Sequence, residues 1–529
     1  MSIADTPANR AIGEALRRAR ELQQAAEAKG LDVAIAADLE PTEPSTATAA
    51  PVEPSPATLE EPPPDFWETW TESWRHDVSR PDHRTEQAAA RRFVAQFGGE
   101  VRYVPAWGKW LVWDGKRWKI DDGCRVESLA KQTADGLWGD IAQELQRCPR
   151  DAVSSLVSYG RSVSSANGLS HVIQIARSDA TIVVTPDQLD RDGWLLNCGN
   201  GTLDLRTGKL RLHSKCDLIT KAAEVEYRED ADCPTWLRCI RTWMNDDQEL
   251  IDFLRRLAGY WLTGEVREHV LPVFHGPGSN GKSVFVGVLE TLLGPDYAMH
   301  APPDLLMLKK SDAHPTERAD LFGRRLVSCM ETQAGRRLNE ALVKELTGGD
   351  RVRARRMRED FWEFEATHKF VVGCNHKPIV DGTDNGIWRR LRLVPWTRII
   401  PEAEQDHELP QKLRNELDGI LLWCVMGCRE WQAVGLGTAA AIEAATSGYR
   451  TESDILGQWL DDRCVLLETA RTSSQALRDD YVQWCSINGP EPVNSTVFGR
   501  ALSDRGFQVA KIGGRKVRFG IGLKAQEGQ

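Results

Sequence analysis

The apolar positions of the chain follow different periods in different stretches. Apolar residues recur at helical spacing through much of 126–175, and 194–212 has the pattern of a strand, a glycine-rich turn and a second strand. From an apolar helical segment at 250–262, strand and helix patterns alternate as far as about residue 396. This alternation predicts an α/β unit built on a parallel sheet.

The two ends of the chain differ from this middle part. Residues 8–29 could form an isolated helix, but 41–64 contains eight prolines among threonine, alanine, serine and glutamate, which indicates a disordered acidic linker. A mostly helical stretch is expected over 402–465. After it, helices at 474–485 and 495–505 and a hairpin over 507–523 that turns at Gly513–Gly514 give the order of a winged helix.

We therefore predict a multidomain α/β protein. Its expected parts are a largely disordered segment (1–84), an α+β domain (85–235), an α/β core with a parallel sheet (236–400), a helical region (401–465) and a C-terminal winged helix (466–529). With 41% hydrophobic and 27% charged residues, the composition excludes fibrous and wholly disordered proteins.

Composition also bears on the compartment. The longest apolar stretch, 419–428, is shorter than the roughly 18 residues of a membrane span, and the N-terminus lacks the apolar core of a signal peptide. The twelve cysteines have no paired C-x-x-C spacing, which indicates reduced thiols and no zinc site. We expect a cytoplasmic protein without a membrane partner.

The net charge of −10 argues against a partner such as nucleic acid only at first sight. Residues 1–65 contain twelve Asp and Glu against five Lys and Arg, a balance of −7, which leaves −3 for the rest of the chain. Local basic patches are therefore compatible with the composition.

A tryptophan-rich segment surrounds Asp114–Gly115, a pair that suits a type I′ hairpin turn. Its rings, Trp107, Trp110, Trp113 and Trp118, are most simply core residues. Stacking on single-stranded nucleic acid is the functional alternative.

The most specific motif is Gly-Pro-Gly-Ser-Asn-Gly-Lys-Ser at 276–283, which matches G-x-x-x-x-G-K-[ST] completely. An expected strand at 270–274, with Pro272 near its beginning, precedes the motif, and an expected helix at 283–293 follows it. In such a loop the glycines let the backbone approach phosphates, Lys282 neutralises the β and γ oxygens, and Ser283 ligates Mg²⁺. The predicted nucleotide-binding residues are Gly276, Pro277, Gly278, Ser279, Asn280, Gly281, Lys282 and Ser283.

Three further elements could complete a hydrolytic site. Glu331 ends the apolar run 326–330, where it could hold Mg²⁺ or polarise the attacking water, and Asn375 ends the run 370–374, where it could orient that water. Arg389 and Arg390 could neutralise charge in the transition state, in cis or across a subunit boundary.

Two basic segments are candidates for DNA contact. Lys344 belongs to an expected helix with Leu338, Leu342 and Leu346 on one stripe, and arginines follow it before an expected hairpin tip near 358–360. The candidates are Lys344, Arg353, Arg355, Arg356 and Arg358, with Arg515, Lys516 and Arg518 on the expected wing. A solvated charged hairpin and a wing used for protein contacts are the alternatives.

Together these marks resemble the C-terminal half of the phage and plasmid primase-helicase family, superfamily 3 helicases of the satellite-phage and poxvirus kind. The similar segments are 196–205 (Leu-Asn-Cys-Gly-Asn-Gly-Thr-Leu-Asp-Leu), 276–283, 344–350, 373–375 and 384–390, within a resemblance that covers most of 107–523. Members are AAA+-like ATPases that assemble as rings, usually hexamers, and move 3′ to 5′ along single-stranded DNA.

The resemblance implies a role for each matching position. Lys282 and Ser283 correspond to Walker A, Glu331 to Walker B, Asn375 to the sensor, and Arg389 or Arg390 to an arginine finger acting in trans. The arginine-rich hairpin corresponds to the element that grips DNA in the central channel. Many relatives have a second Walker B carboxylate, whereas Thr332 and Gln333 follow Glu331 here, so this departure bears on the hydrolysis rate.

The sequence thus predicts an ATP- and Mg²⁺-dependent DNA helicase for replication of a phage, prophage or plasmid-like element. Its expected partners are single-stranded and forked DNA, further copies of itself in a ring, and a primase or polymerase recruited through the N-terminal segment. An ATP-switched replication initiator without processive unwinding is the second hypothesis. A primase is the third, although no paired carboxylates with a histidine precede the ATPase core and we expect the N-terminal primase domain to be lacking.

Overall fold

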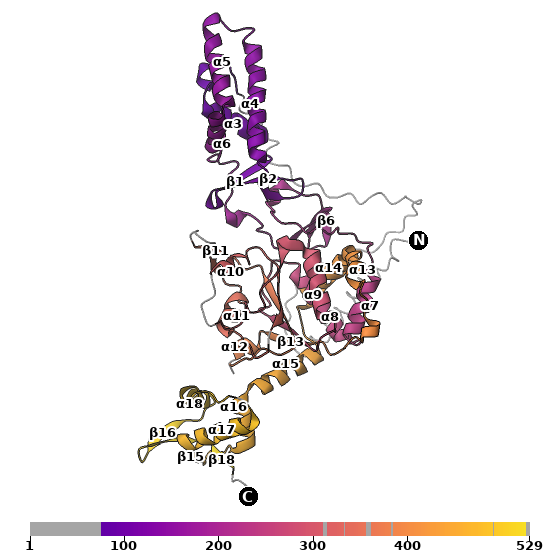
Figure 1. Cartoon of the computed structure of the whole chain (residues 1–529), viewed down its shortest axis with the longest axis vertical. Helices are drawn as coiled ribbons and strands as arrows, with labels where there is room; N and C mark the ends of the chain where they lie inside the picture. Colours follow the sequence, from indigo (N-terminus) through magenta and orange to yellow (C-terminus); the bar gives the residue numbers. More distant parts are fainter. Residues whose placement is uncertain are drawn as a thin grey trace, which may run out of the picture.

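The computed structural model describes residues 76–309, 315–332, 334–355, 361–381, 385–489 and 491–524, arranged in three parts along the longest axis (Figure 1). The helix and acidic linker expected within residues 1–75 lie outside these ranges. Within them, none of the helices combines the length and the apolar character that a membrane span requires.

The N-terminal part is a helical bundle beside a small sheet. Helices α3 (Glu86–Phe97), α4 (Arg125–Glu144), α5 (Arg150–Ser164) and α6 (Ala166–Ala176) project from one end of the molecule (Figure 1). Strands β1 (Val101–Val104), β2 (Lys109–Trp113) and β3 (Trp118–Ile120) form an antiparallel sheet. Phe93, Leu137 and Leu156 are fully buried between the helices, so the helical spacing of 126–175 produces a packed core as expected.

The turn of the tryptophan-rich hairpin is not of the predicted type I′. Only Gly115 of the two central residues, Gly115 and Lys116, has a positive φ (98°), whereas a type I′ turn needs two. Asp114 lies one position earlier, and its carboxylate accepts from the backbone of Lys116 and Arg117, both at 2.9 Å. Trp118 is fully buried and Trp110 is 9% exposed, which supports core packing for these two rings.

A second antiparallel sheet connects the N-terminal part to the middle one. It consists of β4 (Leu195–Cys198), β5 (Gly201–Asp204) and β6 (Lys209–Arg211), and α7 (Pro234–Trp243) and α8 (Gln248–Trp261) follow it. Leu196 and Leu203 are fully buried in the same apolar cluster as Phe253 and Leu257 of α8. This sheet therefore packs onto the middle part of the molecule.

The middle part is built on a five-stranded parallel sheet with the order β13-β7-β12-β9-β8. Its strands are β7 (Leu271–His275), β8 (Ala298–His300), β9 (Leu326–Thr332), β12 (Lys369–Cys374) and β13 (Leu391–Pro395). All six residues of β12 are buried, as a central parallel strand requires. The α/β class and the parallel sheet predicted from the alternating pattern are confirmed.

Helices surround this sheet. α9 (Lys282–Tyr297) bends at Gly294, and α10 (Pro315–Ala319), α11 (Glu340–Leu346) and α12 (Asn385–Trp388) are short. α13 (Leu409–Arg414) precedes α14 (Leu417–Val434), which packs along α8, while α15 (Ala440–Ser453) packs along β13 and leads towards the third part (Figure 1). Leu338 precedes α11 in an isolated bridge with Met307, so the apolar stripe expected on one helix begins outside that helix.

The C-terminal part has its own apolar core. Helices α16 (Ile455–Arg463), α17 (Ser474–Asn488) and α18 (Ser495–Asp504) enclose Trp459, Tyr481 and Leu502. The strands are β14 (Cys464–Val465), β15 (Arg471–Ser473), β16 (Val509–Ile512), β17 (Arg515–Phe519) and β18 (Gly522–Leu523). β16 and β17 form the hairpin expected at Gly513–Gly514, and both glycines have positive φ (58° and 80°). The expected helix, helix, hairpin order is present.

Candidate functional site

The segment 276–281 joins the end of β7 to the start of α9 and is held by two close approaches. A side-chain carbon at Gly276 would lie 2.0 Å from the Trp396 carbonyl oxygen, and one at Gly281 would lie 2.4 Å from the Trp243 ring. Gly281 also has a φ of 88°, and Ser279 has a φ of 56°. The close contacts therefore leave room only for glycine at positions 276 and 281. The strand, loop and helix order expected around the motif is present.

A cavity of about 260 Å³ opens in front of this segment. Side chains and backbone from the ends of three neighbouring strands, β7, β12 and β9, meet there, because parallel strands present their carboxyl ends at one edge of the sheet. The cavity is lined by Gly278, Ser279, Asn280, Gly281, Lys282, Ser283, Val284, Met330, Glu331, Gly373, Cys374 and Asn375. The fold thus brings together most of the predicted loop residues with Glu331 and Asn375, while Gly276 and Pro277 lie beside the lining.

Glu331 occupies a bulge at the end of β9. Met330 pairs with Gly373 and Thr332 pairs with the next residue, Cys374, so Glu331 is the extra residue on its strand. Its φ of 64° is unusual for a residue other than glycine, and the residue is exposed at the cavity. The bulge changes the direction of the side chain at the strand end, which is where the sequence placed a carboxylate.

Lys282 is 5% exposed and its ammonium group lies among neutral oxygens. It donates to the carbonyl oxygens of Gly276 (2.8 Å) and Pro277 (3.0 Å) and to the side-chain oxygens of Asn280 (3.1 Å) and Asn375 (3.2 Å). Burial lowers the pKa of Lys282 below its ordinary value. The contact with Asn375 joins the loop directly to the end of β12.

The oxygen donors in the cavity suit a hard divalent cation. Ser283 offers a hydroxyl and Glu331 a carboxylate, and Mg²⁺ is commonly held by one or two protein oxygens together with substrate phosphates and waters. Among the residues that the structure describes, no cluster of three or more His, Cys, Asp or Glu side chains could hold a metal by itself.

Arg389 and Arg390 lie at the amino ends of the strands, whereas the cavity lies at their carboxyl ends. The Arg390 carbonyl accepts from the Leu271 amide at 2.7 Å, at the beginning of β7, whereas the cavity is at the end of that strand. A five-residue strand spans about 16 Å, so neither arginine is brought to the cavity of its own chain. Arg390 is 9% exposed and donates to Thr347 Oγ1 (3.2 Å) and the Gly386 carbonyl (2.9 Å), whereas Arg389 is exposed.

The arginine-rich segment forms a hairpin of β10 (Val352–Ala354) and β11 (Trp362–Phe364). Val352 and Ala354 are buried, so the alternating Arg353 and Arg355 are exposed. Both guanidinium groups lie over the ring of Phe361, at 4.7 and 4.9 Å from its centroid, and that residue is 47% exposed. Lys344 lies half-buried on α11, while Arg356, Arg358 and the expected tip fall outside the described residues.

The three basic candidates of the C-terminal hairpin differ in exposure. Arg515 and Lys516 are exposed, but Arg518 is 4% exposed and donates to the carbonyl oxygens of Gly499 and Phe507 and to Ser503 Oγ. Arg518 thus holds α18 against the hairpin. Lys511, which the sequence reasoning missed, is exposed and pairs directly with Lys516. Counting residues outward from the glycine turn could have found it.

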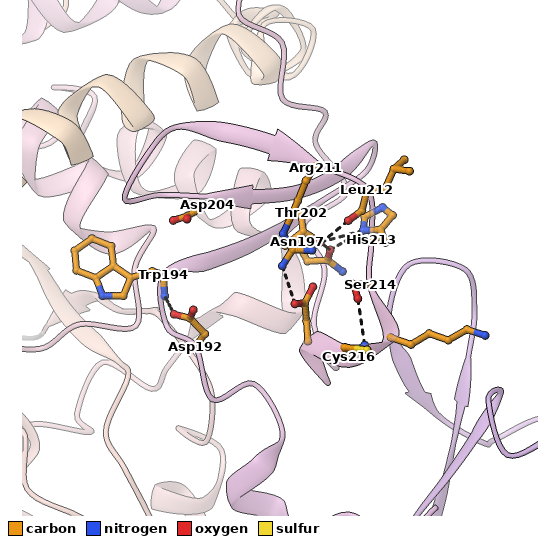
Figure 2. Close-up of polar contacts among 12 residues, drawn as sticks. Asp192, Trp194, Asn197, Thr202, Asp204, Arg211, Leu212, His213, Ser214 and Cys216 are labelled. Carbon is orange, nitrogen blue, oxygen red and sulfur yellow. Dashed lines mark hydrogen bonds and ion pairs between the residues drawn. The ribbon is translucent and has the colours of Figure 1, made fainter. Parts of the chain in front are cut away.

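The motif 196–205 is absent from the lining of the cavity. Its polar contacts form a joint between the N-terminal and middle parts, by which we mean the contacts made by Asn197 and the residues around it (Figure 2). The Asn197 amide nitrogen donates to the carbonyl oxygens of Lys116 (2.9 Å) and Lys221 (3.1 Å). Its oxygen accepts from Thr202 Oγ1 (2.9 Å) and His213 Nδ1 (2.7 Å) (Figure 2). Asn197 therefore connects the N-terminal hairpin to the sheet that packs on the middle part.

A second connection runs through the far end of α9. The Arg117 guanidinium forms an ion pair with Asp296, whose carboxylate also accepts from the Ala222 amide at 3.2 Å. The backbone N–H of Asn197 donates to the Tyr297 hydroxyl at 3.3 Å. The helix that begins at the candidate phosphate loop thus ends against the same joint.

Two family models match the chain. Residues 90–246 match the model described as D5 N terminal like, and residues 274–390 match a family of unknown function (DUF5906). The second match spans the cavity-lining segments of β9 and β12 and the arginine-rich hairpin.

Curated relatives come from large DNA viruses. The chain is 24% identical over 420 residues to a candidate helicase of Acanthamoeba polyphaga mimivirus, which covers 72% of this chain and 43% of the relative. It is 26% identical over 326 residues to a candidate primase of African swine fever virus (57% and 34% covered). It is also 26% identical over 262 residues to a candidate helicase of Frog virus 3 (45% and 26% covered). The chain therefore spans less than half the length of these relatives.

Among solved structures, the apo C-terminal region of NrS-1 aligns with a TM-score of 0.44 at 12% identity, covering 83% of this chain and 99% of that one. The D5 N terminal like match and the similarity to viral helicases and primases confirm the resemblance to the phage and viral primase-helicase family that the motifs predicted.

Proposed function

We propose that the protein is an ATP-driven DNA helicase that acts in replication of a phage, prophage or plasmid-like element. The proposal rests mainly on the cavity, where the lysine at the start of α9 meets the carboxylate at the end of β9 and the amide that follows β12. The viral relatives that are named as candidate helicases agree with it.

In the proposed site, ATP places its phosphates along the loop and the first turn of α9. The Lys282 ammonium neutralises the β and γ oxygens, Glu331 polarises the attacking water, and Asn375 orients that water. Mg²⁺, when bound by Ser283 and Glu331, would neutralise further phosphate charge. Because Lys282 donates to Asn375 in the structure, phosphate binding would compete with that contact and release the amide for the water.

Arg389 supports a site completed by a second copy of the chain. It is exposed at the amino ends of the strands, and a five-residue strand of about 16 Å separates this end from the cavity, so we infer that it reaches a phosphate in a neighbouring subunit. Arg390 is engaged within its own chain, which makes Arg389 the better candidate for a finger acting in trans. We infer a ring, with a hexamer as the family expectation.

The exposed basic hairpins support DNA contact. Arg353 and Arg355 present positive charge beside the exposed ring of Phe361, a combination that suits phosphates and a stacked base of single-stranded DNA. In the C-terminal part, which we interpret as a winged helix, Lys511, Arg515 and Lys516 present charge on the hairpin. A translocating ring would move the first hairpin and draw one strand through its channel, in the 3′ to 5′ direction by family expectation.

The test is unwinding of a forked DNA with a 3′ single-stranded tail, with ATP and Mg²⁺. We expect the wild type to unwind the fork and Lys282→Ala to leave it intact. Lys412→Ala is the matched control, because Lys412 is exposed and pairs with Asp406 away from the cavity. Unwinding that Lys282→Ala retains would contradict the proposed phosphate site.

The departure in the sequence after Glu331 favours one alternative, an ATP-switched initiator that binds origin DNA without processive unwinding. A single carboxylate could bind Mg²⁺ and yet support only slow hydrolysis. Sequence-specific duplex binding with negligible turnover and no unwinding on either polarity of fork would support this alternative over the helicase.

A further inference from the structure

Asn280 lies within the candidate phosphate loop, but its side chain is engaged by protein atoms on every polar position. The residue is 3% exposed. Its amide nitrogen donates to the carbonyl oxygens of Pro277 (2.5 Å) and Trp396 (3.0 Å), and its oxygen faces Lys282 Nζ at 3.1 Å. One short side chain thus touches the loop, the segment after β13 and the lysine.

The partners fix the orientation of this amide. Carbonyl oxygens only accept hydrogen bonds and an ammonium group only donates them, so the nitrogen must face Pro277 and Trp396 and the oxygen must face Lys282. No other standard side chain of this size offers two donors on one atom and an acceptor on the other. An aspartate of the same shape would place carboxylate oxygens against two carbonyls.

The segment after β13 holds the loop at a second point. The Ile400 amide donates to the Ser279 carbonyl at 2.8 Å, and Gly276 allows close approach to the Trp396 carbonyl. Residues 396–400 are therefore a support against which the loop is fixed, and Asn280 is the side chain that joins the two. Arg389 precedes the same strand at its other end.

We propose that Asn280 is a positioning residue for ATP, which acts through Lys282 and touches no transferred phosphoryl group. It holds the loop against residues 396–400 and fixes the position of the Lys282 ammonium at which the phosphates would bind. This role rests on the proposed nucleotide site and adds a residue whose effect must depend on the lysine. Electrostatic binding of phosphate needs the charge at a fixed place, and that is what the amide supplies.

The test is a double-mutant cycle on the full chain, with the Kd of ATPγS and Mg²⁺ measured by calorimetry. Because the hydrogen bond to the charged Lys282 ammonium is lost, we expect Asn280→Ala to weaken binding roughly tenfold to a hundredfold. We expect Lys282→Ala to weaken it more. The double variant should then bind within about twofold of Lys282→Ala, because residues in one network are not additive.

A merely structural role would give a different pattern. Loss of folding stability alone would make the two losses multiply, and that outcome, or wild-type affinity in Asn280→Ala, would overturn the proposal. Wild-type affinity in Lys282→Ala would overturn the nucleotide site itself and the Asn280 role with it. The matched control is Asn339→Ala, since Asn339 caps α11 in the same part of the molecule and should lower the melting temperature without changing the Kd. If Asn280→Ala does not fold, Asn280→Ser carries the same cycle.

Discussion

The candidate phosphate loop (276–283) and the motif at 196–205 look alike as sequences and differ in where their polar groups lead. Both are short and contain glycines and asparagine next to a buried strand, β7 before the loop and β4 and β5 within the other motif. In the loop, Lys282 and Ser283 line a cavity together with Glu331. In the other motif, Asn197 is fully buried and its amide is occupied by partners within the chain.

The difference distinguishes residues that could bind a ligand from residues that hold the fold together. A polar group that lines an open cavity can exchange its protein partners for a ligand, whereas one enclosed by backbone carbonyls holds two parts of the chain together. Substitutions should therefore act on activity at the first motif and on stability at the second.

The largest effect should come from the carboxylate of the cavity. Glu331→Gln keeps the size of the side chain but removes its charge, so we expect hydrolysis to fall by roughly a hundredfold to a thousandfold while ATP affinity changes little. Steady-state ATPase kinetics with a separate binding measurement check both halves. Unchanged turnover would remove Glu331 from the chemistry and weaken the contrast between the motifs.

The corresponding change at the joint is Asn197→Ala. It leaves the Lys116 and Lys221 carbonyls without this donor, so we expect the free energy of unfolding to fall by about 3 kcal/mol. Urea unfolding measures the loss, and the ATPase rate per folded molecule should stay near the wild-type value. A collapse of that rate in the folded variant would show that the joint transmits to the cavity through α9.

A third effect should appear on acidification. Burial lowers the pKa of His368 to about 3, from an ordinary value of 6.5, so the unfolded chain binds the extra proton between these values. Stability from this group is therefore full above pH 6.5 and is lost as the pH falls towards 3, by roughly 2–3 kcal/mol at about pH 4.5. His368→Phe should flatten this part of a plot of unfolding free energy against pH, and an unchanged slope would contradict the assignment.

The smallest effects should separate the two basic hairpins. We expect Arg353→Ala with Arg355→Ala to weaken single-stranded DNA binding by about tenfold at low salt and to reduce the salt dependence, because the two proposed phosphate contacts would be lost. Arg518→Ala should lower the melting temperature of the C-terminal part and leave single-stranded DNA affinity unchanged, since its guanidinium holds α18. Fluorescence anisotropy across a salt series measures the first, and calorimetry the second.

Much of this organisation could be predicted from the sequence because it depends on local patterns. Buried strands ending in Glu331 and Asn375 appear as short apolar runs, and parallel strands gather their ends at one edge. The fate of individual arginines could not be predicted this way. Arg389 and Arg390 are neighbours in sequence, yet only the fold turns one outward and the other towards Thr347.

The joint was also beyond local reasoning. Asn197 contacts Lys116, which lies 81 positions earlier, and Asp296 pairs with Arg117 across 179 positions. No hydrophobic periodicity and no sequence motif predicts either contact. The type I′ turn predicted at Asp114–Gly115 was wrong for a local reason: the central residues of the turn are Gly115 and Lys116, and only Gly115 has a positive φ.

The bulge at Glu331 implies that thermal stability and catalytic turnover favour different residues at this position. A left-handed backbone conformation is strained for glutamate and relaxed for glycine, by about 1 kcal/mol or more. A library of variants screened only for folded protein at high temperature would be expected to enrich glycine at this position. The selected variants would be more stable and inactive. A glutamate retained there under combined screening would indicate that its carboxylate is selected for work at the cavity.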